Sequence, residues 1–149
     1  MHIGIVTARF NEIVVRSLLE GARRALREAD VEENAVRIVE VPGAFEIPWG
    51  VAILIDQWRP DGVIALGAII QGETEHHQYI AHAVFSALAH LSTQYKIPIG
   101  LGILTTATLQ QALERAGGKL GNKGYEAARA VLQCLRISVT PSDHGPEDV

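Results

Sequence analysis

Short β-branched runs alternate with longer segments of helical periodicity along this chain, and this alternation restricts the fold more than any other feature. The runs have the length and β-branched character of strands and cover His2 to Thr7, Val36 to Val41, Gly62 to Ile70 and Ile99 to Leu104. The remaining periodic segments predict helices at about Glu12 to Ala29, Ala44 to Gln57, Thr74 to Tyr95, Leu109 to Ala116 and Lys123 to Ile137. Strands that alternate with helices predict an α/β fold in which right-handed crossovers build a parallel sheet with helices on both faces. We therefore expect a three-layer α/β sandwich around a four-stranded parallel sheet.

Size and charge limit the classes of protein to which the chain can belong. Its 149 residues, 48% of them hydrophobic, suit one domain, which we expect to span residues 1–137. Residues 138–149, which end in PSDHGPEDV, predict a disordered acidic tail. A formal net charge of −4 with dispersed Lys and Arg argues against a nucleic-acid partner.

Location and membrane contact can also be predicted from the sequence. No apolar run approaches the ~20 residues that cross a bilayer, and the N-terminus lacks the pattern of a secretory leader. The single cysteine, Cys134, excludes an internal disulfide framework and fits a reducing compartment. We expect a cytoplasmic protein with no membrane partner, and we expect Cys134 to be packed and inert because it lies in an apolar helical pattern.

The segment GETEHHQY, Gly72 to Tyr79, carries the strongest signal for chemistry because it lies where a strand becomes a helix. A helix N-terminus leaves backbone N–H groups unpaired and carries a partial positive charge, so this turn predicts an anion site. His76 and His77 stand beside it, and histidine exchanges protons near neutral pH.

Ligands of open parallel sheets bind beyond the carboxyl ends of the strands, where the strand order reverses. For the flavodoxin-like order 2-1-3-4, this rule brings the loop at Ala8 to Asn11 close to Gln71 to His76, with Pro42 to Glu46 alongside. Phe10 would offer an aromatic face, Glu46 a hydrogen-bond acceptor and His76 a proton relay. The residues alone also allow a flavodoxin-like nucleotide-binding module, with Phe10 in the core and the histidines merely solvated.

Two other kinds of site are poorly supported. Four of the six histidines lie between residues 76 and 90, but no two of these have the helical spacing of three or four that brings metal ligands onto one face. We expect His82 and His90 on a polar helix face or at a subunit contact. The glycines at Gly100 and Gly102 lack the third glycine of a dinucleotide fingerprint, and GGKLGNKG, Gly117 to Gly124, lacks the Walker spacing, so we expect a helix C-cap and connection there.

Four ordered motifs resemble those of lumazine synthases. They are RFN at Arg9 to Asn11, VPGAFEIP at Val41 to Pro48, GETEHHQY, and LERAGGKLGNKG at Leu113 to Gly124, and the resemblance extends to about residue 137. It implies condensation of 5-amino-6-ribitylaminouracil with 3,4-dihydroxy-2-butanone 4-phosphate to 6,7-dimethyl-8-ribityllumazine, the penultimate step of riboflavin biosynthesis. It also implies that the enzyme, a transferase, needs no metal or organic cofactor.

The same resemblance implies roles for individual residues. His76 matches the proton-shuttling histidine, and His77 is more a wall of the pocket than a second relay. The pyrimidine substrate would contact Phe10, Ala44, Phe45, Glu46, Ala68, Ile69, Ile70 and Leu101. The phosphate would contact Gly72, Glu73, Thr74, Arg115 and Lys123. Arg115 has a structural alternative, an ion pair with Glu114 or a favourable interaction with its helix dipole.

Assembly follows from the resemblance as well. Sites of the family lie between adjacent subunits of a pentamer, with Leu101 and Arg115 from one chain and Phe10, Glu46 and His76 from its neighbour. Leu101 stands where many relatives have phenylalanine. The compact GGKLGNKG connection favours assembly of pentamers into a sixty-subunit icosahedral shell, whereas the short N-terminus argues against it. The alternative from another class is a self-assembling cage or flavin-like ligand-binding protein with secondary catalysis.

Overall fold

The computed structural model describes residues 1–73, 75–137 and 139. Its central sheet contains β1 (Ile3–Ala8), β2 (Val36–Val41), β3 (Gly62–Ile70) and β4 (Ile99–Thr106), in the order β2-β1-β3-β4. All three pairings are parallel, and Ile5 lies opposite both Ile38 and Ile64. The predicted α/β fold and strand order 2-1-3-4 are confirmed.

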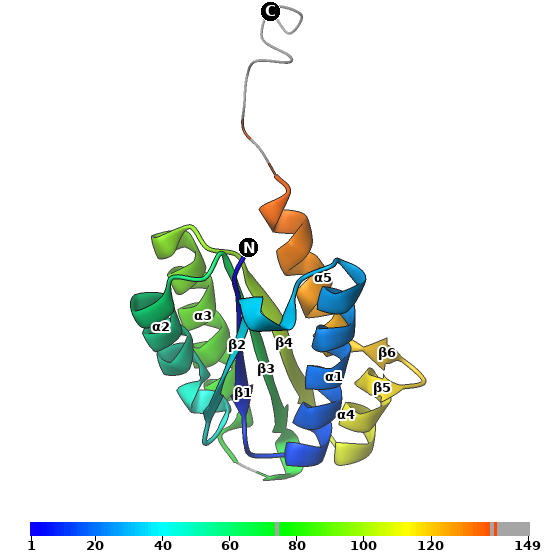
Figure 1. Cartoon of the computed structure of the whole chain (residues 1–149). Coiled ribbons are helices and arrows are strands. Elements are labelled where there is room, and N and C mark those ends of the chain that lie inside the picture. The colour runs from blue at the N-terminus through cyan, green and yellow to red at the C-terminus, as the bar shows by residue number, and fades with distance from the viewer. Residues whose placement is uncertain (74, 138, 140–149) are drawn as a thin grey trace, which may run out of the picture.

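Helices cover both faces of this sheet (Figure 1). α2 (Ile47–Trp58) and α3 (His77–Tyr95) lie on one face, and α1 (Glu12–Glu28), α4 (Leu109–Arg115) and α5 (Lys123–Leu135) lie on the other. A short 3₁₀ turn, η1 (Glu33–Ala35), leads into β2. Every residue of β3 is buried, as expected for a central strand that helices cover on both sides.

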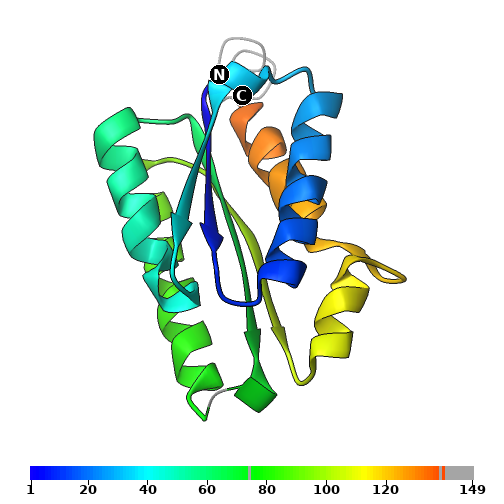
Figure 2. The same ribbon diagram turned by 60° about the horizontal axis from the view of Figure 1, so that its bottom comes forward.

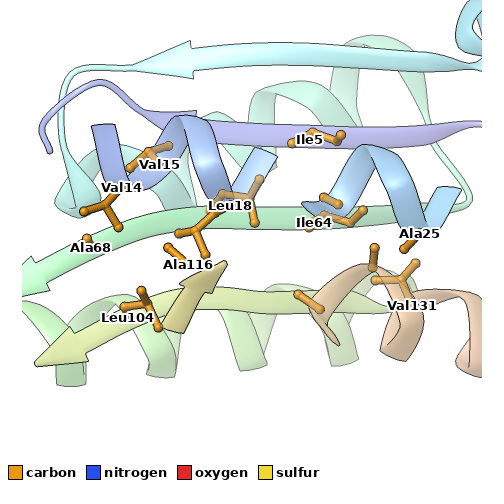
Figure 3. Close-up of a cluster of buried hydrophobic side chains, with 14 of the residues drawn as sticks. Ile5, Val14, Val15, Leu18, Ala25, Ile64, Ala68, Leu104, Ala116 and Val131 are labelled. Carbon is orange, nitrogen blue, oxygen red and sulfur yellow. The ribbon is translucent and has the colours of Figure 1, made fainter. Parts of the chain in front are cut away.

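The core has two parts, one on each side of the sheet. Figure 3 shows the part between the sheet and α1 and α5, where Leu18 and Val131 project toward Ile5 and Ile64. These four side chains have at most 1% of their surface exposed. Burial of each aliphatic side chain of this size contributes about 1.5–3 kcal/mol, so this layer holds α1 and α5 firmly on the sheet.

Two helices begin later than predicted. The segment predicted as one helix from Ala44 contains a 3₁₀ turn, η2 (Ala44–Glu46), and α2 begins only at Ile47. Pro48 explains this boundary, because proline lacks an N–H and is tolerated in the first turn of a helix but not in its interior. Similarly, the chain after β3 forms η3 (Gln71–Glu73), and α3 begins at His77.

The predicted connection at Gly117 to Gly124 is wrong in part, because it contains two further strands. β5 (Ala116–Gly118) and β6 (Gly121–Asn122) form an antiparallel pair, and α5 begins directly after them. Gly117 and Gly121 have φ angles of 105° and 90°, values that glycine adopts readily and other residues do not. The short hairpin therefore depends on these glycines.

The prediction for Cys134 is also wrong, since its side chain is exposed rather than packed. The apolar period places Val131 and Leu132 in the core, and Cys134 lies beside the buried face of the same helix rather than within it. The predicted tail at 138–149 falls outside the described residues except for Val139. None of the helices in the described part of the chain is long and apolar enough to cross a membrane.

Candidate active site

The carboxyl ends of β1, β2 and β3 are joined by hydrogen bonds at one edge of the sheet, which Figure 2 brings forward. The backbone N–H of Arg9 donates to the Val41 carbonyl at 2.8 Å, and that of Phe10 donates to the Pro42 carbonyl at 3.1 Å. These bonds extend the β1–β2 pairing beyond the strands, so the loops after β1 and β2 run side by side. The predicted convergence of these segments is therefore present.

A groove opens between these loops and the start of α3, with a cavity volume of about 270 Å³. Its floor is formed by the last residues of β3, and two aromatic side chains stand at its rim, Phe10 at 60% and Phe45 at 62% exposure. An apolar groove with exposed aromatic rings can receive a flat heterocycle. The groove is lined by Phe10, Asn11, Gly43, Ala44, Phe45, Glu46, Ala68, Ile69, Ile70, Glu73 and Ile80.

Glu46 supplies the acceptor that the sequence predicted at this groove. The 3₁₀ turn closes with the Glu46 N–H donating to the Gly43 carbonyl at 3.1 Å. The Glu46 Oε1 atom lies 3.2 Å from the point where a Cβ on Gly43 would stand, so the carboxylate folds back over this glycine. A half-buried carboxylate beside an apolar groove can accept hydrogen bonds from hydroxyl groups of a ligand.

Asn11 is a groove residue that sequence reasoning did not select. It has a left-handed backbone with φ 65°, and its Nδ2 donates to the Ala68 carbonyl oxygen at 3.2 Å. Asparagine tolerates this conformation better than most residues, and its position between Phe10 and α1 is the signal that could have revealed it. Asn11 ties the loop that carries Phe10 to the end of β3.

The predicted anion turn lies next to the groove. Glu73 lines both the groove and the adjoining hollow, which is formed with Gln71, Gly72, Glu75 and His77. The N-cap residue of α3 is His76, so the unpaired N–H groups of the first helix turn lie at this turn. Thr74, the remaining predicted phosphate ligand, lies outside the described residues.

The charge at this turn does not favour an anion. The described residues around the hollow include the carboxylates Glu73 and Glu75 but no lysine or arginine. Two carboxylates repel phosphate, whereas a helix N-terminus attracts it only weakly at an exposed position. The turn therefore needs a cation from elsewhere to bind phosphate tightly.

His76, the predicted proton relay, is exposed at the start of α3. Its ring centroid lies 6.5 Å from that of Tyr79, at an interplanar angle of 47°. His77 is half-buried and lines both the hollow at this turn and a second hollow, which it shares with Phe85 and the end of β4. The two adjacent histidines therefore differ in burial, and the role of His76 as the relay stays a prediction.

Four predicted site residues line neither the groove nor the adjoining hollow, namely His76, Leu101, Arg115 and Lys123. Gly72 lines the hollow alone. Leu101 lies on β4 and is 39% exposed, on the same face as Ile103, which packs beneath α2 and α3. Arg115 and Lys123 lie at the end of α4 and the start of α5, in the helical layer on the opposite face of the sheet. Arg115 is exposed, and Glu114 pairs with Lys119 at 3.7 Å rather than with its neighbour Arg115.

A sequence profile of the 6,7-dimethyl-8-ribityllumazine synthase family matches residues 1–138. The chain belongs to this family. It is 48% identical over 137 residues to the 6,7-dimethyl-8-ribityllumazine synthase of Levilactobacillus brevis, an alignment that covers 92% of this chain and 87% of that protein. The predicted enzyme class is confirmed: the chain is a transferase of riboflavin biosynthesis, and its product is 6,7-dimethyl-8-ribityllumazine.

The other histidines do not form a second site in the described part of the family domain. His82 and His90 are exposed on α3, as predicted. Among the residues that the structure describes, no group of three or more His, Cys, Asp or Glu side chains could hold a metal ion.

Proposed function

We propose that the groove binds 5-amino-6-ribitylaminouracil and that the adjoining turn binds the phosphate of 3,4-dihydroxy-2-butanone 4-phosphate. The two compounds would then condense to 6,7-dimethyl-8-ribityllumazine, with phosphate and water as co-products. The observation that carries this proposal is the convergence of three strand ends on one apolar groove with the N-terminal turn of α3 beside it. Holding two reactants in one geometry can contribute about 7–11 kcal/mol in favourable cases, so this enzyme acts largely as a template.

The pyrimidine would lie on the rim and floor of the groove. Phe10 stacks on the heterocycle, an interaction of about 1–3 kcal/mol for a base on an aromatic ring. Glu46 accepts hydrogen bonds from the ribityl hydroxyls, and Ala44 and Phe45 enclose the chain. Backbone groups at 68–70 meet the ring edge. The exposure of Phe10 supports this role, because an aromatic ring at a groove rim has one face available for a ligand.

The phosphate would lie over the turn at Gly72, Glu73 and Thr74, where backbone N–H groups and the Thr74 hydroxyl donate to it. The Glu73 carboxylate must point away from the phosphate, because the two negative charges repel each other. The lack of lysine and arginine among the described residues around this turn supports a supply of positive charge from a second subunit. Arg115 suits this task, since a guanidinium binds phosphate through two parallel hydrogen bonds, and Lys123 adds a second cation.

In a pentamer, each active site would have two halves from adjacent subunits. One half is the groove with the adjoining turn, and the other consists of Leu101, Arg115 and Lys123 of the next subunit, which face that groove. Exposed apolar surface supports this arrangement, because large patches of it mark protein contacts. Along α3 only Val84 and Leu88 are buried among the described residues, whereas Tyr79 is 77% exposed, and Trp49 on α2 is 63% exposed. The compact β5–β6 hairpin supports further assembly of pentamers into a sixty-subunit icosahedral shell.

His76 would move the protons that the condensation requires. The pyrimidine amine attacks the ketone and water leaves, phosphate departs with its bonding electrons, and the ribityl-bearing nitrogen closes the ring with loss of a second water. Each step transfers a proton, and a well-placed general acid or base contributes about 10²- to 10⁴-fold. The atoms balance without an oxidant or reductant, so we propose no redox cofactor.

We further propose that residues 1–137 form the catalytic domain and that it works in the cytoplasm, where the exposed thiol of Cys134 would stay reduced.

Mixed assemblies test the shared site. His76→Ala and Arg115→Ala damage opposite halves, so a co-assembled equal mixture should recover roughly a quarter of wild-type activity, because a site formed by two intact halves arises at that frequency. Lumazine absorbance measures turnover. A mixture of His76→Ala with Phe10→Ala is the matched control, because both changes damage the same half and no intact site can form. No recovery in the first mixture, or equal recovery in both, would contradict the proposal. Assembled wild-type protein that makes no lumazine would favour the cage alternative.

A further inference from the structure

The side chain of Asn122 joins two helices and the short hairpin. Its Oδ1 accepts from the Tyr125 N–H at 3.1 Å, which caps α5, and its Nδ2 donates to the Ser17 carbonyl on α1 at 3.0 Å. Both ends of the amide are therefore used at once. Aspartate could cap the helix but could not donate to Ser17, and serine could cap it but is too short to reach α1.

The packing around Asn122 leaves its amide little room to move. A Cβ on Gly21 of α1 would stand 2.2 Å from the Asn122 Oδ1 atom. A Cβ on Gly124 of α5 would stand 2.0 Å from the Leu18 carbonyl oxygen, so the two helices approach closely at this level. The glycine at position 21 thus provides the space that the amide fills, and the position of α1 determines the position of Asn122.

Asn122 is adjacent to both cations of the proposed phosphate site. It pairs with Ala116 across the β5–β6 hairpin, and Arg115 directly precedes Ala116. Lys123 directly follows Asn122 and begins α5. Ala116 is 5% exposed and packs in the core beside α1 and α5. The backbone that carries Arg115 and Lys123 is therefore held at two points, by burial of Ala116 and by the Asn122 bridge.

We propose that Asn122 is a positioning residue that fixes Arg115 and Lys123 for binding the phosphate of the substrate. This inference rests on the proposed function, which assigns both cations to phosphate. Lys119 and Leu120 at the hairpin tip are exposed, so the Asn122 bridge holds the base of an otherwise solvent-facing hairpin. When the bond to Ser17 is lost, the cations keep their charge but lose their fixed geometry, which weakens binding of the phosphate substrate more than binding of the pyrimidine.

Asn122→Ser tests the proposal because serine retains the cap of α5 and removes the bond to Ser17. We expect KM for the butanone phosphate and the inhibition constant of inorganic phosphate to rise about three- to tenfold, the effect of one lost hydrogen bond. KM for the pyrimidine and the assembled state should stay as in the wild type. Gly21→Ala, which displaces the amide from the α1 side, should give the same pattern without changing Asn122.

Val131→Ala is the matched control, because it weakens the packing of the same helix away from the hairpin. An equal rise in the phosphate KM for this control, or loss of assembly in Asn122→Ser, would show a purely structural role and overturn the proposal. The effect of Asn122→Ser should also shrink in an Arg115→Ala background, since Asn122 acts through that residue. If Arg115→Ala and Lys123→Ala leave both phosphate constants unchanged, the proposed function fails. If Arg115→Ala and Lys123→Ala raise KM for the butanone phosphate and the inhibition constant of inorganic phosphate but Asn122→Ser does not, only the positioning role of Asn122 fails.

Discussion

Replacement of Asn11 by alanine should cost about 2–3 kcal/mol of stability, from two separate terms. The lost hydrogen bond to the Ala68 carbonyl, which is partly buried, contributes about 1 kcal/mol. The left-handed backbone, with φ 65°, adds about 1–2 kcal/mol because alanine has a Cβ and no compensating polar group. No capping term enters, since Asn11 makes no side-chain capping bond to α1.

Asn11→Gly separates these terms, because glycine accepts the left-handed backbone and loses only the hydrogen bond. Its cost should be about 1 kcal/mol. Both variants should raise KM for the pyrimidine about three- to tenfold, because both free the loop that carries Phe10 from the end of β3. Asp30→Ala is the control: Asp30 is also left-handed, with φ 61°, but lies at the other end of α1. It should lower stability without changing either KM.

Unfolding by denaturant at one fixed protein concentration measures the stability terms, because assembly makes apparent stability depend on concentration. Steady-state lumazine formation gives the two KM values. Equal stability losses for Asn11→Ala and Asn11→Gly would refute the argument about backbone strain. Unchanged pyrimidine KM in both variants would refute the view that Asn11 holds the groove.

Two further predictions concern the groove and the turn. Phe10→Ala should raise KM for the pyrimidine about five- to hundredfold, by loss of stacking, while Phe10→Tyr keeps the ring and stays near wild type; similar constants for both variants would contradict the stacking role. Glu73→Gln should lower KM for the butanone phosphate about two- to fivefold at low ionic strength and have little effect at high salt, because it removes a negative charge beside the phosphate. Glu33→Gln, an equal charge change in η1 before β2, serves as its control, and a salt-independent effect of Glu73→Gln would exclude the electrostatic explanation.

The positions of the strands and their parallel pairing could be predicted because each strand is a short β-branched run that is separated from the next by a helical segment. β3 illustrates this point, since its nine residues are all buried and its sequence has no charge. The order of the strands does not follow from this alternation, and its prediction rests on flavodoxin-like folds. Helix starts were predicted less accurately. Pro48 fits the first turn of a helix as well as a loop before it, and only the backbone geometry distinguishes the two.

The hairpin and the contacts of Asn122 could not be predicted in the same way. GGKLGNKG has no strand periodicity, and its glycines fit a helix end as well as a tight turn. Ser17 and Asn122 are 105 residues apart, so nothing local in either segment indicates their hydrogen bond. Cys134 was assigned to the core because a helical period tells which residues share a face but not how wide the buried face is.

The α/β class, the positions of the four sheet strands and the motifs that identify the family follow from the amino-acid sequence, because they depend on local periodicity and on residues in a recognisable order. The tertiary structure decided which of those residues share one groove. Phe10, Glu46 and Ala68 meet there because parallel pairing brings the carboxyl ends of β1, β2 and β3 to one edge. Arg115 lies outside that groove because α4 packs on the face of the sheet opposite α2 and α3. The crossover after β4 sets this separation, and no local sequence pattern indicates it.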